Sequence, residues 1–416
     1  MGLATGCQIN LKNVFSRKNY FYPDSPKGYQ ISQFDLPICE NGFLNIGSKK
    51  VQIQRIHMEE DAGKTTHHSG YSLVNLNRAG VPLCEVVSGP DMTSSAEAGT
   101  YLRGLYSVVT SLGICDGNLQ EGNFRCDANV SIKPKGSATL GTRTEIKNVN
   151  SFRFVEKAID FEVARQKQVI AAGGKIVQET RLYDSDKNVT VSMRSKEEAH
   201  DYRYFPDPDL MTVELESSWV EKIRSSLPEL PEQKRARFTS EYGLNEYDAV
   251  FVTSLKSLAD FFENTLPLVS GDKKASAKAI ANLLSGEVAR LSNDSGLEIS
   301  QSKLAPSHLA EVVQLLQSSL ISNQGAKQVI NAVWKTGEKV SDIVDREGLK
   351  QVSDLGAIEP AVEKIIAANP DNVAAYLGGK EKLLGFFVGQ VMKETGGKAN
   401  PALIQELVKK KLKGSL

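Results

Sequence analysis

The sequence contains no apolar run close to the roughly 20 residues that a helix needs to cross a bilayer. Its opening residues lack the charged stretch followed by an apolar run that a signal peptide requires, and Gly6 stands where a myristoylation motif has Ser or Thr. These absences argue against a membrane-spanning helix and predict a cytosolic protein.

Cysteine is scarce, and its few copies are scattered. No two of them form a CxxC pair, and their number is odd: Cys7, Cys39, Cys84, Cys115 and Cys126. An odd, unpaired set of this kind argues against a disulfide framework and against a zinc ribbon. We therefore predict that the cysteines are free thiols.

Net charge is absent as well, because 50 Lys and Arg residues balance 50 Asp and Glu residues. Bulk electrostatics therefore gives no sign of a nucleic-acid partner, and any contact with phosphates must be local. Residues 376–416 carry eight Lys and three Glu, which is a local net charge of +5. Two interpretations of this excess remain open: a solvated helix end whose lysines complement the helix dipole, or a phosphate-binding surface.

The length and composition indicate a globular protein of several domains. A chain of 416 residues exceeds the size of one ordinary domain, and its 40% apolar and 24% charged residues exclude a disordered chain. Two prolines in the polar segment 225–238 and a second change near Gly348 mark boundaries. We predict three domains, at 1–232, 233–347 and 348–416.

The first predicted domain is rich in strands. Apolar and polar residues alternate with the period of half-buried strands in five segments: 51–58, 71–77, 123–134, 142–150 and 189–194. Two helical segments, 94–113 and 151–174, begin after a Ser or Asn and end at Gly. Strands with segregated helices predict an α+β fold with mostly antiparallel sheets.

The rest of the chain shows apolar residues at helical spacing. The segments that predict an all-helical domain are 258–266, 277–291, 308–320 and 326–337. A second set predicts a small helical tail domain: 361–370, 380–397 and 400–412.

Aromatic and cationic residues are interleaved in the segment RKNYFYPDSPKGYQISQFDLPI (17–38). Arg17, Lys18 and Lys27 lie among five rings, so the segment could form a surface that stacks bases and neutralises phosphates. Residues of this kind more often belong to the core, with YPDSPKG forming a turn. The residues alone leave both interpretations open.

Acidic residues are concentrated in HMEEDAGK (57–64), where His57, Glu59, Glu60 and Asp61 are neighbours. Glu85 follows in a later apolar run, so Glu60 and Glu85 could meet across neighbouring strands and hold Mg²⁺. A solvated or salt-bridged acidic cluster is the alternative. The AGKT in this segment is not a P-loop, because Met58 stands where the first glycine belongs.

Polar residues also occupy one face of the alternating segment 123–134, where Arg125, Asp127 and Asn129 share a face. Glu145 and Lys147 share a face of the next predicted strand. Such faces occur where a sheet lines a polar cleft and where it borders solvent.

Six segments, in order along the chain, resemble the B-subunit family of aspartyl/glutamyl-tRNA(Asn/Gln) amidotransferases: RKNYFYPD (17–24), HMEEDAGK (57–64), LNR with PLCE (76–85), DYRYFPDPDL (201–210), LPELPEQKRARF (227–238) and GFFVGQVMKETGGKANP (385–401). Members of that family act with an amidase, the A subunit, and with a small C subunit on mischarged Glu-tRNA(Gln) or Asp-tRNA(Asn). The B subunit uses ATP and Mg²⁺ to phosphorylate the side-chain carboxylate, and ammonia from the amidase then displaces phosphate. The resemblance implies the same function here.

The resemblance also implies roles for single residues. Glu60 and Glu85 are expected to bind Mg²⁺, Lys18 to neutralise phosphate or carboxylate, and Asp127 to act in the active site. The candidates for binding ATP or substrate are His57, Glu59, Arg125, Glu145 and Lys147.

The fold implied by the resemblance is a cradle-like catalytic domain, an all-helical domain and a helical tail domain that binds tRNA. This favours the phosphate-binding interpretation of the basic end. The lysines implied in tRNA binding are Lys393, Lys398, Lys409, Lys410 and Lys411.

Members of the family begin with a further segment that includes a GLEVH motif, which this sequence does not contain. We expect a misassigned start, a truncated chain or a natural variant with an impaired site. The last case would leave a protein that binds tRNA or serves as a scaffold. The presence of Lys18, Glu60, Glu85 and Asp127 together speaks for chemistry, on Glu-tRNA(Gln), Asp-tRNA(Asn) or both.

Overall fold

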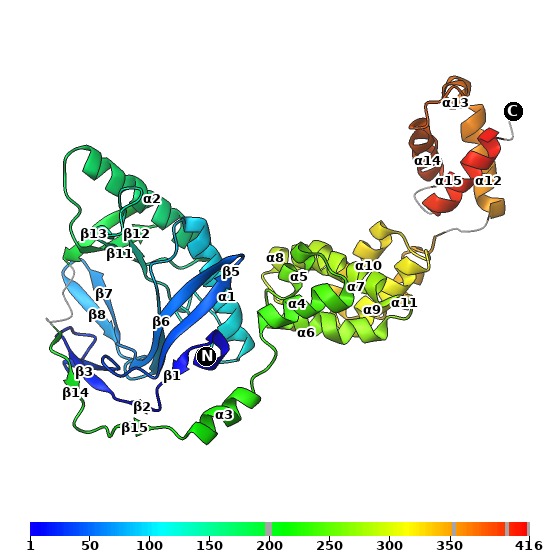
Figure 1. Ribbon diagram of the computed structural model, residues 1–416. Helices are drawn as coiled ribbons and strands as arrows, with labels where there is room; N and C mark the ends of the chain where they lie inside the picture. Colours follow the sequence, from blue (N-terminus) through cyan, green and yellow to red (C-terminus); the bar gives the residue numbers. More distant parts are fainter. Residues whose placement is uncertain (196–201, 352–354, 396–398, 414–416) are drawn as a thin grey trace. The chain divides into compact units, whose positions relative to one another are not determined.

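The computed structural model describes residues 1–195, 202–351, 355–395 and 399–413 (Figure 1). The chain forms two compact units, Met1–Pro231 and Glu232–Leu416. Sheets occupy the first unit and helices the second, so the predicted α+β class is confirmed. No helix in the described ranges has the length and apolar character needed to cross a membrane.

A seven-stranded antiparallel sheet forms the base of the first unit. Its strands follow the order β1 (Gln8–Ile9), β5 (Cys39–Ile46), β6 (Lys49–Glu60), β4 (Tyr29–Ser32), β3 (Ser16–Asn19) and β14 (Phe205–Pro206), and β9 (Pro82–Ser88) also pairs with β6. Strand β6 is therefore the centre of the sheet, with neighbours from three other parts of the chain.

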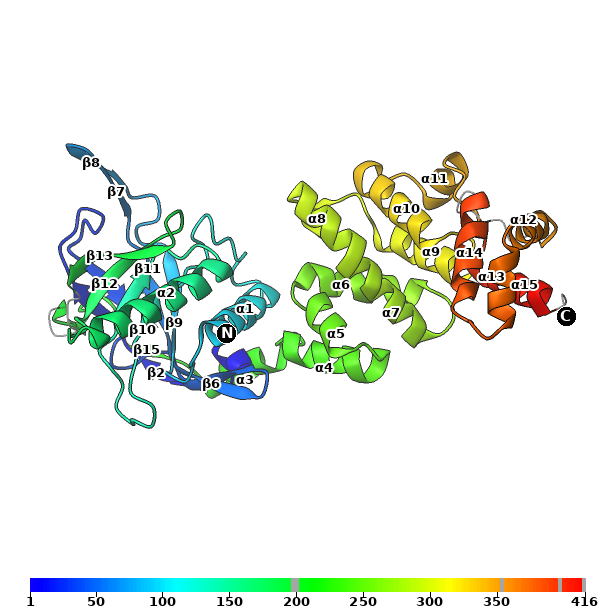
Figure 2. The same cartoon turned by 90° about the horizontal axis from the view of Figure 1, so that it is seen from above.

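A four-stranded sheet consists of β10 (Ala128–Val130), β11 (Thr144–Lys147), β12 (Glu179–Asp184) and β13 (Val189–Ser195). Strands β11 and β12 are parallel because helix α2 (Phe152–Ala171) connects them. Two small sheets pair β2 (Lys12–Asn13) with β15 (Val213–Glu214), and β7 (Lys64–His68) with β8 (Tyr71–Asn75). In Figure 2 the β7–β8 hairpin extends outward from the unit.

Helices α1 (Ser95–Ser111) and α2 join the two large sheets through one core. Each begins at a serine whose hydroxyl accepts a backbone N–H: Ser94 from Glu97 at 3.2 Å and Ser151 from Phe154 at 3.1 Å. The core includes fully buried residues from both sheets and from α2, such as Val51, Ile53, Ile146, Ala158 and Tyr183. Short helices η1 (Gly2–Thr5) and α3 (Ser217–Ser225) complete the unit.

The second unit contains two separate hydrophobic clusters. The larger is built by α4 (Pro231–Tyr242), α5 (Glu246–Val252), α6 (Lys256–Thr265), η3 (Leu266–Leu268), α7 (Lys273–Leu283), η4 (Leu284–Val288), α8 (Ala289–Ser295), η5 (Ile299–Gln301), α9 (Pro306–Gln317), α10 (Asn323–Thr336) and α11 (Val340–Arg346). The smaller is built by α12 (Leu355–Ala367), α13 (Pro370–Leu377), α14 (Leu383–Glu394) and α15 (Pro401–Lys413).

Candidate functional site

A β-bulge in β6 creates a polar face on the seven-stranded sheet. Val51 and Ile53 are fully buried in the core below the sheet, and the pairing with β9 shifts by one residue after Ile53. The extra residue reverses the alternation, so that Ile56 returns to the core. The side chains of Arg55, His57 and Glu59 consequently belong to the opposite face.

Three possible metal ligands gather on this face. Glu85 of β9 lies directly opposite His57 of β6, and Glu59 is two residues further along the same strand. One ligand atom from each of these residues lies within 4.8 Å of the other two. No other such group of three occurs among the residues that the structure describes.

The Glu59 carboxylate is held by neighbours on β4 and β6. It accepts hydrogen bonds from Ser32 Oγ at 2.8 Å and from Gln30 Nε2 at 3.0 Å, and it lies 3.1 Å from His57 Nε2. Burial by itself would raise the pKa of Glu59, but the contact with His57 and the positive charge of Lys18 outweigh burial and lower the pKa below its ordinary value. Glu59 is therefore an anion at neutral pH.

The residues present fit a hard divalent cation. Two carboxylates, from Glu59 and Glu85, are the oxygen ligands that Mg²⁺ takes while keeping several waters. His57 Nδ1 is buried without a hydrogen-bond partner, which is costly unless a further group satisfies it. Glu85 is exposed, so the cluster is open to a ligand from solvent.

Glu60 lies elsewhere, and the predicted meeting of Glu60 with Glu85 is wrong in register. Glu60 is paired with Pro82, whereas Glu85 is paired with His57. Glu60 is three positions from His57 along β6, and residues an odd number of positions apart on a strand lie on opposite faces. Its carboxylate accepts the backbone N–H of Ile31 at 2.9 Å and pairs with Lys27. The role of Glu60 as a metal ligand stays a prediction that would require it to exchange Lys27.

The segment 202–206 lies against the polar face through its tyrosines. The Tyr204 ring stacks on Phe34 with centroids 4.2 Å apart, and Lys18 lies 5.0 Å from the centre of the Tyr202 ring. Burial, and then the nearby charge of Glu59, raises the pKa of Tyr204 well above its ordinary value. Tyr204 therefore stays neutral beside the acidic cluster.

An ion pair fixes this segment to the sheet. Arg17 of β3 donates to Asp207 at 2.8 Å through Nε and to Asp209 at 2.8 Å through Nη2. The Arg17 guanidinium also lies 4.4 Å from the centre of the Tyr29 ring. The cations and rings that alternate in the sequence are therefore in contact in the structure. The contacts of Arg17 hold residues 202–210 against β3 through β14.

Asp61, directly after β6, connects the end of that strand to the chain that enters β10. Its buried carboxylate accepts from Arg125 Nη2 at 2.8 Å and from Arg78 Nε at 3.0 Å. Arg78 also donates to Glu121 O at 3.1 Å. Arg125 is thus part of a network around Asp61.

Asp127, Lys147 and Glu145 form a second polar group, on the four-stranded sheet. Lys147 Nζ lies 2.6 Å from Asp127 Oδ2 and 3.8 Å from Glu145 Oε1. Thr180 of β12 donates to the other oxygen of Glu145 at 3.0 Å. The predicted sharing of a face of one strand by Glu145 and Lys147 is therefore observed, and Lys147 lies between the carboxylates of Glu145 and Asp127.

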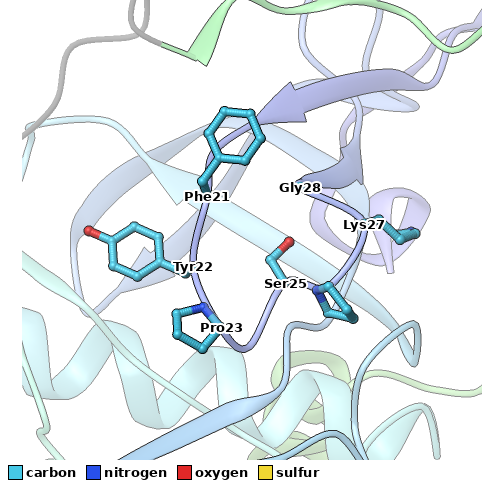
Figure 3. A pocket seen from close by; sticks show the side chains of 7 residues that line it. Phe21, Tyr22, Pro23, Ser25, Lys27 and Gly28 are labelled. Atoms are coloured by element: carbon cyan, nitrogen blue, oxygen red, sulfur yellow. The ribbon is translucent and has the colours of Figure 1, made fainter.

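A shallow pocket occupies the loop between β3 and β4, where Ser25 and Gly28 close tight turns (Figure 3). It is lined by Phe21, Tyr22, Pro23, Ser25, Pro26, Lys27 and Gly28. Figure 3 shows the Tyr22 side chain pointing out of the loop, whereas the strongly exposed Phe21 ring lies close to Gly28. The pair of Lys27 with Glu60 ties this loop to the end of β6.

The basic end of the chain contains lysines in different situations. Lys411 lies 2.6 Å from Glu359 and 2.5 Å from Glu363, so it ties α15 to α12. Lys393, Lys409 and Lys410 are exposed. Lys398 falls outside the described residues.

The chain matches known families over both units. Residues 1–221 match the GatB/GatE catalytic domain, and residues 260–412 match the GatB domain. The B subunit of the aspartyl/glutamyl-tRNA(Asn/Gln) amidotransferase from Trichlorobacter lovleyi is 56% identical over 99% of this chain and 87% of that protein. Its counterpart from Halorhodospira halophila is 53% identical over 100% of this chain and 87% of that protein.

The chain belongs to the B-subunit family of these amidotransferases. The B subunit from Geobacter sulfurreducens, 54% identical over 99% of this chain, agrees with this assignment. The family places the polar face of β6 and the Asp127 group in one catalytic domain, residues 1–221.

Arg55 and Tyr204 of the polar face were not singled out by the sequence analysis. A lone arginine in an alternating strand carries no spacing signal, and its face depends on a bulge that the sequence does not announce. Tyr204 belongs to DYRYFPDPDL, a segment that helped to identify the family but assigned no role to its rings.

Proposed function

We propose that this chain is the component of a tRNA-dependent amidotransferase that activates the mischarged amino acid. It transfers the terminal phosphoryl group of ATP to the side-chain carboxylate of Glu-tRNA(Gln), Asp-tRNA(Asn) or both. Ammonia, released from glutamine by the amidase of the complex, its A subunit, then displaces phosphate and leaves the amide. A small C subunit completes the complex. The names of the relatives, which specify the B component of a tRNA(Asn/Gln) amidotransferase, support this proposal.

The observation that carries the proposal is the gathering of Glu59, Glu85 and Lys18 on one face of the sheet. A carboxylate reacts with ammonia only after its oxygen has become a good leaving group, and phosphorylation achieves this. Catalysis of phosphoryl transfer by a protein is mainly positioning and charge neutralisation. Carboxylates that hold a metal and an adjacent cation supply both.

The residues then take distinct roles. Glu59 and Glu85 would hold Mg²⁺, which supplies charge neutralisation for the phosphoryl group, and His57 orients Glu59. Lys18 attracts the anionic oxygens of the substrate. Tyr204, stacked on Phe34, shields one side of the face from water, and the side with Glu85 stays open to substrate.

The second polar group supplies the remaining site residues. Asp127 accepts a hydrogen bond from the Lys147 ammonium, and Glu145 forms a second ion pair with the same ammonium. Arg125 acts through Asp61, which holds the end of β6. We assign Asp127 to orientation of the nucleophile, and Lys147 and Glu145 to binding of ATP or substrate.

The experiment is to combine the chain with the A and C subunits and to measure conversion of Glu-tRNA(Gln) to Gln-tRNA(Gln) with glutamine and ATP. The proposal expects conversion that requires ATP, Mg²⁺ and the mischarged tRNA. Tight tRNA binding without consumption of ATP would instead identify a binding or scaffold protein.

A further inference from the structure

Arg55 is a further cation of the polar face of β6. It precedes His57 by two residues on β6, directly after the bulge, and it lies opposite Val87 of β9. Tyr204, which is close to the charges of Glu59 and Glu85, is also within the electrostatic reach of Arg55. Arg55 therefore borders the acidic cluster on the side away from the end of β6.

The Arg55 guanidinium is partly buried and unsatisfied. Its Nε is buried without a hydrogen-bond partner, and no residue in the described part of the chain forms an ion pair with it. Its terminal nitrogens make no hydrogen bond to a described residue and are not buried, so they are open to solvent. The Arg55 side chain is thus buried as far as Nε, and its two terminal nitrogens face solvent.

Comparable arginines of the same unit are satisfied. Arg181 is buried to a similar or greater degree, yet it donates to Thr190 and pairs with Glu179 at 2.5 Å. Arg17 pairs with Asp207. Arg55 has no such partner among the described residues, although Glu40 of β5 lies opposite it. An oxyanion at its terminal nitrogens would supply the missing charge-assisted hydrogen bonds.

We propose that Arg55 binds an oxyanion of the substrate on the polar face, through the planar fork of its guanidinium. This inference rests on the proposed function. Two oxyanions meet there in the proposed reaction: the terminal phosphoryl group of ATP and the side-chain carboxylate of the mischarged amino acid. Both present paired oxygens that match a guanidinium in bidentate geometry. Arg55 is then a substrate-binding residue at the opposite end of the cluster from Lys18.

The test uses the complex with the A and C subunits and the variants Arg55→Lys and Arg55→Ala. We expect Arg55→Ala to lower kcat/KM for amidation by about 100-fold, the size of effect seen when one charge-stabilising donor is removed. Arg55→Lys should restore only part of this loss, because an ammonium cannot make the bidentate contact. A rise in KM for ATP identifies the phosphoryl group, and a rise in KM for the tRNA identifies the carboxylate.

Chemical rescue separates binding from a structural role. Guanidinium at a concentration well below denaturation should restore activity to Arg55→Ala, whereas methylammonium should not. Arg103→Ala is the matched control, since Arg103 is an exposed arginine of α1 paired with Glu156 at 3.0 Å, and neither its activity nor its response to guanidinium should differ from the unaltered complex. Unchanged kinetics in Arg55→Ala, or a loss that guanidinium does not restore, would overturn the proposal.

A binding measurement keeps this test separate from the proposed function. The affinity of the unaltered complex and of Arg55→Ala for ATP and for the mischarged tRNA is measured by calorimetry. If the unaltered complex produces no amide, the proposed function fails. The assignment of Arg55 as an oxyanion ligand is then still supported if its removal weakens either affinity by about tenfold or more. It is wrong if both affinities are unchanged.

Discussion

At the scale of the residue, the carboxylate of Glu85 is the part of the metal site most open to test. Replacing Glu85 by Gln preserves the shape but removes the charge, so we expect activation of Glu-tRNA to fall by about 100-fold or more. The glutaminase activity of the amidase should be spared. Calorimetric titration of Mg²⁺ in the presence of ATP measures the metal affinity, which should fall as well.

Glu60→Gln tests separately whether Glu60 also holds the metal, as the resemblance implies. Glu60 pairs with Lys27 and belongs to the other face of β6, so its loss should leave the affinity for Mg²⁺ within a few-fold of the unaltered value. Unchanged Mg²⁺ affinity in Glu85→Gln, or an equal loss in both variants, would contradict the assignment of the site to Glu59 and Glu85.

At this scale the sequence could not predict the register between strands. The acidic cluster could be recognised from HMEED, but which glutamate meets Glu85 depends on a one-residue bulge in β6. The bulge also decides the face on which Arg55 lies. Family resemblance assigns types of residue to a site, whereas pairing between strands assigns faces.

At the scale of the element, the pair of Arg17 with Asp207 holds β14 against β3. The Asp207 side chain is 2% exposed and that of Asp209 is 82% exposed, although both accept from the same arginine. We expect Asp207→Asn to lower the free energy of unfolding by about 2–3 kcal/mol, because it breaks a buried pair. Asp209→Asn should change it by less than about 0.5 kcal/mol. Urea unfolding followed by circular dichroism measures both.

The loss of unfolding free energy in Asp207→Asn should become smaller as pH falls. Burial by itself would raise the pKa of Asp207, but Arg17 and backbone N–H groups outweigh burial and lower it. The folded pKa is below the unfolded one, so the stabilisation is full above the unfolded pKa and disappears as pH falls through the folded pKa. The difference between the unaltered chain and Asp207→Asn should shrink on acidification. A difference that stays constant down to low pH would contradict this account.

Helix α15 offers a second prediction at this scale. Lys409 and Lys410 are exposed, whereas Lys411 is engaged by Glu359 and Glu363 of α12. Replacing Lys409 and Lys410 together by Ala should weaken tRNA binding and reduce its dependence on salt. Lys411→Ala should affect tRNA binding less than the double variant does.

A filter-binding titration at two salt concentrations distinguishes the variants. Equal losses from Lys411→Ala and from the double variant would show that the whole basic run contacts phosphate. The helical spacing predicted α15, but the partners of Lys411 lie about 50 residues earlier in the chain, beyond the reach of local pattern.

At the scale of the whole molecule, the positive charge of residues 376–416 is concentrated in α15, which contains four of the eight Lys. Lys350 pairs with Ile321 and Gln351 N–H with Leu320 O, so residues up to 351 belong with α9 and α10. Deleting 355–416 should therefore spare the larger helical cluster and weaken tRNA binding by about tenfold or more. Equal affinity with and without the deletion at two salt concentrations would contradict a tRNA-binding tail.

The class of the molecule could be predicted because period-2 and helical patterns occupy different halves of the sequence, and the change falls in the proline-containing segment 225–238. The arrangement of the first unit could not. Strand β6 takes neighbours from residues 29–32, 39–46 and 82–88, and such pairings depend on tertiary packing rather than on local pattern.

The central claim is that the side-chain carboxylate of the mischarged amino acid is phosphorylated before it is amidated. The most direct measurement uses Glu-tRNA(Gln) in which both oxygens of the side-chain carboxylate are ¹⁸O, with the full complex, ATP, Mg²⁺ and glutamine. In an acyl phosphate the bridging oxygen comes from the carboxylate, and attack of ammonia at the carbonyl carbon breaks the bond to that oxygen. The account predicts one ¹⁸O atom in each inorganic phosphate released with an amide. Phosphate without the label, released at the rate of amide formation, would contradict it.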